Sequence, residues 1–133
     1  MWYNRMRKEG IGTKKIGFIT TNKVLAQSLA AAVKGRPDWE NELHLLLNPH
    51  QAALDADVLQ LDAAVIDVAD GIPVEETEAF CRALRKTRNC RLLLLVPKAA
   101  RRMAIRAVKN KAADDFVFYD TSLEYLFTKL AAI

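Results

Sequence analysis

The sequence predicts a single α/β domain, in which a five-stranded parallel sheet lies between two layers of helices. Short apolar runs alternate along the chain with segments whose apolar residues recur at helical spacing, which is typical of parallel sheets. A chain of 133 residues is most simply one domain. The apolar run 63–66 ends in Asp67 and is followed by Gly71 and Pro73. A run of this kind, bounded by turn residues, indicates a strand that is buried on both faces.

Strands and helices are expected in strict alternation. The expected strands are 15–20, 43–47, 63–67, 91–96 and 116–118. The expected helices are 24–33, 50–60, 73–88, 101–113 and 123–130. Thr21 or Asn22 can cap the first helix, Pro73 stands at the opening position that proline prefers, and 121–124 has the spacing of a capping box.

Helical spacing also predicts which apolar side chains face the core. The residues expected to do so are Val24, Leu25, Leu29, Ala32 and Val33, then Ala53, Leu54, Val58 and Leu59, then Ala104, Ile105, Val108 and Ala112, and finally Leu123, Leu126, Phe127 and Leu130. Right-handed crossovers leave few topologies for such a chain. At this size we expect the flavodoxin-like strand order 2-1-3-4-5, a three-layer α/β/α architecture. Ligands of such sheets bind beyond the carboxyl ends of the strands, so Asp67 is the first candidate for a functional residue.

Charge is distributed unevenly along the chain. Residues 38–78 contain acidic residues but no Lys or Arg, and residues 82–111 contain Lys and Arg but no acid. Two interpretations stay open. The charges lie on two solvated faces that balance each other, or the domain is polarised and docks a charged partner or a copy of itself.

Several classes of protein are disfavoured. The apolar runs are too short to cross a bilayer, and no apolar stretch follows the basic start of the chain, so neither a membrane span nor a secretory signal is expected. Residues 1–14 are interpreted as a mobile basic arm. Cys81 and Cys90 form no CxxC motif, which favours reduced thiols in a cytoplasmic protein. His44 and His50 lack the spacing of zinc ligands. No nucleotide-binding glycine loop or hydrolase motif is present, so we expect neither a cofactor nor an enzyme.

Five units of this size, with an aspartate at the end of the third strand, resemble the receiver domain of bacterial response regulators. The resemblance covers residues 15–133, and the order and spacing of all five units carry it. Its strongest local piece is AADDFVFYDTSLEYLFTKL at 112–130, which is similar to the family's GADDY-x-x-KPF-x-x-EEL end. Residues 62–67 are similar to the family's D-L-V-L-L-D.

The resemblance implies a phosphoacceptor position at Asp67, which in the family works with Mg²⁺ and three other groups. The family's acidic pair after the first strand is replaced here by Thr20 and Thr21, which are poor ligands for Mg²⁺. Its Thr or Ser after the fourth strand is replaced by Pro97, and its Lys after the fifth strand by Tyr119. Without these groups, Asp67 is interpreted as a solvated or N–H-bonded acid at a strand end.

Two further positions follow from the resemblance. The switch aromatic of the family falls on Phe116, which is less able than Tyr to exchange a hydrogen bond. Asp70 is a candidate substitute metal ligand, although an Asp beside Gly71 just before a helix is more often a cap.

We therefore expect a degenerate receiver, or pseudo-receiver, that acts by protein–protein contact without phosphorylation. By resemblance, its interaction face is built by the fourth helix, the fifth strand and the fifth helix, and both signs of charge on it permit a homodimer. The residues expected on this face are Arg101, Arg102, Arg106, Lys109, Lys111, Asp115, Asp120 and Glu124, with Asp114 nearby.

Two alternatives remain open. One is a working receiver in a phosphorelay, with Mg²⁺ held near Asp67 and Asp70. The other is nucleic-acid binding by the basic arm together with the fourth helix. The arm residues concerned are Trp2, Tyr3, Arg5, Arg7, Lys8, Lys14 and Lys15. The acidic region 38–78 disfavours this alternative, because it would repel nucleic acid.

Overall fold

The computed structural model describes residues 14–132 except 38, 69–71 and 87–88. The expected arm 1–14 therefore lies outside the described residues apart from Lys14, and so does the candidate ligand Asp70. Among the helices that the structure describes, none has the length and apolar character needed to span a bilayer.

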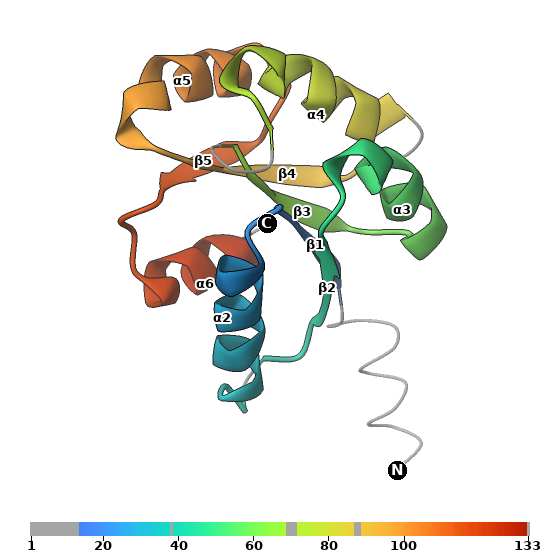
Figure 1. Ribbon diagram of the computed structural model, residues 1–133, viewed down its shortest axis with the longest axis vertical. Coiled ribbons are helices and arrows are strands. Elements are labelled where there is room, and N and C mark those ends of the chain that lie inside the picture. The colour runs from blue at the N-terminus through green and yellow to red at the C-terminus, as the bar shows by residue number, and fades with distance from the viewer. Residues whose placement is uncertain (1–13, 38, 69–71, 87–88, 133) are drawn as a thin grey trace.

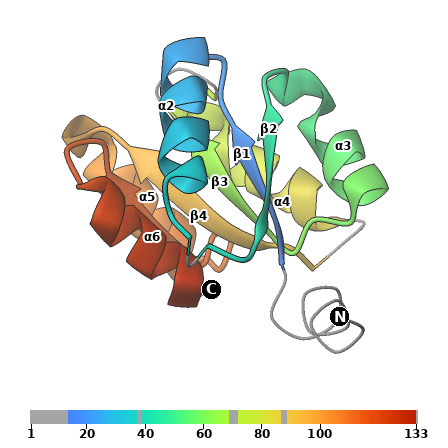
Figure 2. The same ribbon diagram turned by 90° about the horizontal axis from the view of Figure 1, so that it is seen from below.

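A parallel sheet of five strands forms the centre of the molecule, in the order β2-β1-β3-β4-β5. The strands are β1 (Lys15–Ile19), β2 (Glu42–Leu46), β3 (Ala63–Asp67), β4 (Arg91–Val96) and β5 (Asp115–Phe118). The helices are α2 (Lys23–Lys34), α3 (Ala52–Leu59), α4 (Thr77–Lys86), α5 (Arg101–Lys109) and α6 (Leu123–Ala132). Helices α3, α4 and α5 cover one face of the sheet, and α2 and α6 cover the other (Figures 1 and 2). The expected fold class and strand order are confirmed.

The apolar core is split by the sheet into two clusters. Ile16, Phe18 and Val65 point toward α2 and α6, whereas Ile19 and Ile66 point toward α3, α4 and α5. This alternation follows from the two-residue period of a strand. Every residue of β3 is buried, because β1 and β4 flank it and helices cover both of its faces. The prediction of a doubly buried central strand is confirmed.

Helix ends differ from the expectation where short 3₁₀ turns and caps take over. Turns of this kind, Pro49–Gln51, Val74–Glu76 and Lys98–Ala100, precede α3, α4 and α5. The side chain of Asn22 accepts from the backbone N–H of Leu25 at 3.0 Å, which makes Asn22 the cap of α2. Ser122 Oγ accepts from the N–H of Tyr125 at 3.2 Å, so Ser122 takes the capping role at α6 that the sequence assigned to Thr121. Helix α5 ends at Lys109 because Lys111 adopts a left-handed conformation with φ 61°.

Some of the expected core-facing residues are exposed, which corrects the helical phases. Leu54 and Val58 of α3 are 58% and 70% exposed, because α3 buries Ala52 and Ala56 instead. Ile105 of α5 is 44% exposed, and Met103, Ala104 and Ala107 form its buried side. Val24 and Leu123 are also exposed. Small side chains allow α3 and α5 to approach the sheet closely, which spacing of large apolar residues alone does not predict.

Asp114 links the start of β4 to α4. Its carboxylate pairs with Arg85 and accepts from the N–H of Leu92 at 2.8 Å. Arg85 also donates to the backbone oxygens of Cys90 and Lys111, at 3.1 and 2.8 Å. This network gives a structural reason for the first aspartate of the AADDF sequence.

We predict that Gly17→Ala destabilises the protein by about 1–3 kcal/mol, because β1 passes so close to Leu61 that the core is overpacked by a methyl group. A Cβ at position 17 would lie 2.6 Å from a methyl of Leu61, which is fully buried, and 3.4 Å from a methyl of Leu46. Urea unfolding of the variant measures the change.

Gly35→Ala is the matched control for this prediction. Its Cβ would meet backbone oxygens at an ordinary 3.7 Å, and φ at Gly35 is −80°, which alanine adopts readily. We expect no loss of stability there. Equal losses in both variants would contradict the assignment of the Gly17 effect to crowding.

Candidate functional site

Asp67 and Thr20 lie side by side at the carboxyl edge of the sheet. The register of β1 and β3 pairs Ile19 with Ile66, so Thr20 and Asp67, which follow them in the two strands, are neighbours. Thr20 Oγ1 donates to Asp67 Oδ2 at 2.5 Å and accepts from the N–H of Asn22 at 2.9 Å. Both Asp67 and Thr20 are completely buried. Asp67 is therefore not a solvated acid, and that part of the expectation is wrong.

The groups around Asp67 do not suit Mg²⁺. A hard cation prefers several carboxylate oxygens and waters. Here the first strand contributes Thr20, whose hydroxyl already serves Asp67 and Asn22, and the exposed Thr21. In the part of the chain that the structure describes, no three His, Cys, Asp or Glu side chains gather in a way that would hold a metal. The donor set thus disagrees with the metal that the resemblance implies.

The positions after β4 and β5 form a bridge of their own. Pro97 and Tyr119 occupy the expected ends of these strands, and the N–H of Tyr119 donates to the oxygen of Val96 at 3.0 Å. The next residues, Lys98 and Asp120, pair at 2.9 Å. This bridge between the two loops was missed from the sequence, although both residues directly follow the degenerate positions. Since its side chains are 73% and 63% exposed, it contributes little to stability.

Phe116 lies on the face of the sheet that α3, α4 and α5 cover. It is half-buried against the core cluster there and packs edge-on against Phe118, with ring centroids 5.6 Å apart. Phe116 carries no hydroxyl that a change at Asp67 would pull inward. The ring therefore acts as a packing element.

The expected interaction face contains basic side chains on α5 and acidic side chains that already have partners. The basic residues Arg101, Arg102, Arg106, Lys109 and Lys111 are all exposed. The acidic residues pair within the molecule: Asp115 with Lys129 at 2.6 Å, Asp120 with Lys98 at 2.9 Å, and Glu124 with Arg36 at 2.5 Å. The hydrogen bond to Asp115 raises the pKa of Lys129. Because Arg36 directly follows the C-cap of α2, Glu124 is directed toward α2 rather than α5.

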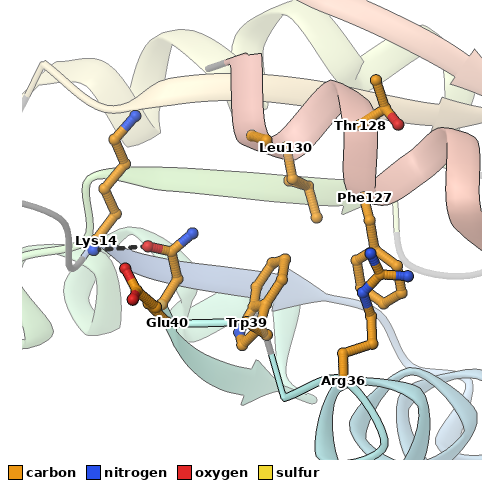
Figure 3. A pocket seen from close by; sticks show the side chains of 9 residues that line it. Lys14, Arg36, Trp39, Glu40, Phe127, Thr128 and Leu130 are labelled. Atoms are coloured by element: carbon orange, nitrogen blue, oxygen red, sulfur yellow. Dashed lines mark hydrogen bonds between the residues drawn. The ribbon is translucent and has the colours of Figure 1, made fainter.

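A pocket of about 410 Å³ lies at the opposite edge of the sheet from Asp67, where α6 meets the connection from α2 to β2 (Figure 3). Arg36 stacks over the ring of Phe127, 4.6 Å from its centroid, and Trp39 packs against the same ring with centroids 5.2 Å apart. The Nε1 of Trp39 is buried and has no hydrogen-bond partner among the described residues. These contacts join α2 to α6, and they lie too far from Asp67 to take part in chemistry there.

The two cysteines are buried free thiols. Burial raises the pKa of the Cys81 thiol to about 12. Because the thiolate is the reactive form of cysteine, Cys81 is not a nucleophile at neutral pH.

We predict that Thr20→Val destabilises the protein by about 1–2 kcal/mol, because a buried acceptor on Asp67 loses a hydroxyl donor. Thr20→Ser keeps the hydroxyl and should retain most of the stability. The exposed Thr128, whose hydroxyl donates to a helix carbonyl, supplies the matched control Thr128→Val, for which we expect little change. Denaturant unfolding of the three variants measures these effects. A Thr20→Val protein as stable as the unchanged chain would show that the hydrogen bond does not hold Asp67.

Comparison with known proteins identifies the fold. No family model matches the chain, and no curated protein matches it. Solved structures do match. A two-component response regulator from Clostridium difficile has a TM-score of 0.74 and 18% sequence identity, over 90% of this chain and 93% of that one.

Two further structures illustrate the range of proteins that share the architecture. The activated N-terminal receiver domain of RstA from Klebsiella pneumoniae matches with a TM-score of 0.71 and 18% identity, over 89% of this chain and 96% of that one. A protein described as an adenylate cyclase from Rhodopirellula baltica matches with a TM-score of 0.75 and 15% identity, over 90% and 86%. Together with the strand order and the buried aspartate at the end of β3, these likenesses show that the chain has the fold of a response-regulator receiver domain.

Proposed function

We propose that this receiver-like domain signals by protein–protein contact and does not depend on phosphorylation of Asp67. The observation that carries the proposal is the enclosure of Asp67, which is 0% exposed and bound by the neutral hydroxyl of Thr20. Phosphoryl transfer needs a nucleophile that is accessible in line with the donor and cations that neutralise the transferring oxygens. Asp67 meets neither requirement in the described part of the molecule.

Each degenerate position removes a different contribution to that chemistry. Thr20 supplies no carboxylate for a metal, and Pro97 has neither a hydroxyl nor an N–H for a phosphoryl oxygen. Tyr119 lies where a Lys would supply positive charge, and it is half-buried against the cluster beneath α2 and α6. Lys98, which directly follows Pro97 in the chain, pairs with Asp120. Because these contributions act together in stabilising one transition state, the loss of all of them is not made up by Asp67 alone.

A phosphoaccepting receiver is the second candidate. It is favoured by the place of Asp67, which ends β3 at the carboxyl edge of the sheet as the resemblance requires. In this case Mg²⁺ would have to bind after a rearrangement that exposes Asp67 and breaks its bond to Thr20. Asp70, the one additional carboxylate suggested by the sequence, lies outside the described residues.

The contact surface that we propose is the basic outer side of α5. Its exposed cationic side chains suit an acidic protein surface, either on another protein or on a second copy of this chain. The homodimer expected through α5, β5 and α6 stays a prediction. It would require Asp115, Asp120 and Glu124 to leave partners that they already have within the molecule. Binding of nucleic acid by α5 is disfavoured, because the acidic region 38–78 would repel nucleic acid.

We propose no catalytic activity for this domain. We also propose that it lies in the cytoplasm. Support for the location comes from the two free cysteines, since free thiols are typical of a reducing compartment.

We predict that the protein gains no phosphoryl mass when it is incubated with acetyl phosphate and Mg²⁺, because Asp67 is buried and Thr20, Pro97 and Tyr119 replace the groups that would hold the metal and the phosphoryl oxygens. Intact-mass spectrometry measures the outcome, with an ordinary receiver domain in a parallel reaction as the positive control. Asp67→Asn is the matched variant. An added phosphoryl mass that disappears in Asp67→Asn would overturn the proposal and support the second candidate.

A further inference from the structure

A groove of about 470 Å³ runs between α3 and α4, on the same layer as α5. It opens at the carboxyl edge of the sheet, where β2 and β3 lead into the two helices. Its base is apolar: Pro49 and Ile72 are buried, and Phe80 is half-buried. The full lining is Pro49, His50, Ala53, Ile72, Pro73, Glu76, Ala79, Phe80 and Ala83. The small side chains along both helices leave room for a residue that projects from another helix.

Acidic residues lie where α4 begins and along α3, whereas the exposed Arg82 and Lys86 lie farther along α4. Glu76 lines the groove, Glu75 is its exposed neighbour on the 3₁₀ turn, and the exposed Asp57 lies one turn beyond Ala53 on α3. Residues i and i+4 share one side of a helix, which places Asp57 along the line of the groove. No Lys or Arg is among the residues that line it. Leu54 and Val58, which are 58% and 70% exposed, add apolar surface on α3.

Helix α5 presents the complementary pattern on its outer side. Ile105 is 44% exposed, and it is flanked by the exposed Arg102, Arg106 and Lys109. None of these three cationic side chains forms an ion pair with any residue that the structure describes. The exposed part of Ile105 and the three cations around it are therefore available for contact with another molecule.

We propose that α5 of a second copy docks in the groove between α3 and α4, and that the two copies exchange this contact to form a closed dimer. Figure 1 shows α3, α4 and α5 side by side on one face, with α4 between the other two. The helices of such a layer run in the same direction, since each returns between parallel strands. A two-fold axis along the helices turns the layer over, so that α5 of each copy meets the groove of the other. The contact is isologous and leaves no open end.

The spacing of residues along the helices fits this arrangement. Glu76, the last residue of the 3₁₀ turn before α4, is followed at helical spacing by Ala79 and Phe80 of α4, and then by Ala83. In α5, Arg102 is followed at the same spacing by Ile105, and then by Lys109.

With the helices parallel, Arg102 therefore lies level with Glu76, and Ile105 meets the alanine and phenylalanine of the groove. Lys109 falls at the level of Ala83 on α4, and α3 contributes the exposed Asp57 to the same groove.

This inference rests on the proposed function and names a second copy as the partner of α5. It differs from a dimer through α5, β5 and α6 in one observable respect. The dimer in which α5 of each copy lies in the groove of the other, here called the exchanged dimer, uses Glu76. The dimer through α5, β5 and α6 leaves Glu76 exposed to solvent.

Charge reversal on each side of the contact tests the proposal by analytical ultracentrifugation. Glu76→Arg places like charges opposite Arg102, and Arg102→Glu places like charges opposite Glu76. We expect each variant alone to raise the dimer dissociation constant about tenfold or more, since every dimer contains the repulsive contact twice. An equimolar mixture of the two variants should dimerise again, because both contacts of the mixed dimer then join opposite charges.

Two controls separate this result from misfolding and from a failure of the proposed function. Val24→Asp alters an exposed apolar residue on α2, on the other face of the sheet, and should leave the dimer unchanged. Circular dichroism of each variant establishes that it is folded. A monomeric parent protein, a dimer that Glu76→Arg does not weaken, or a mixture that fails to recover would overturn the exchanged dimer. None of these outcomes bears on phosphorylation, which the acetyl phosphate reaction decides separately.

Discussion

The burial of β3 on both faces is the constraint on which the rest of the structure depends. Each of its residues, including the carboxyl group of Asp67, is enclosed between two helical layers and two flanking strands. A buried carboxyl group is costly unless it is hydrogen-bonded, and Thr20 supplies a short bond from the neighbouring strand. With this hydrogen bond, an uncharged hydroxyl group contacts Asp67 at the edge of the sheet. A carboxylate at position 20 would instead place a second acid against Asp67, which is tolerable only when a cation binds both.

The sequence predicts the fold well because its signals are local and redundant. The central strand Ala63–Asp67 and the strand Arg91–Val96 were predicted to the residue, since apolar runs bounded by turn residues define them. Helical phases were less reliable. Leu54 and Ile105 look like core residues by spacing, yet the close approach of α3 and α5 depends on alanines that hydrophobicity alone ranks lower.

At the site, the sequence could place Asp67, Pro97 and Tyr119 along strand ends, but it could not predict which side chains meet. The bond from Thr20, the bridge from Lys98 to Asp120 and the groove between α3 and α4 each join residues from separate elements. The uneven charge along the chain acquires a spatial meaning in the same way. The acids near the groove and the cations of α5 lie in one helical layer. Several other acids, such as Asp114 and Asp115, form ion pairs within the molecule.

The most direct test of the central claim is a titration of the protein with Mg²⁺ at constant ionic strength, followed by two-dimensional amide NMR. If the hydroxyl of Thr20 binds Asp67 and takes the place of the carboxylates that would hold a cation, the amide signals of residues 20–22 and 67–68 should show no saturable shift at millimolar Mg²⁺. A saturable shift of these signals, abolished by Asp67→Asn, would contradict the account and show that the end of β3 is a metal site.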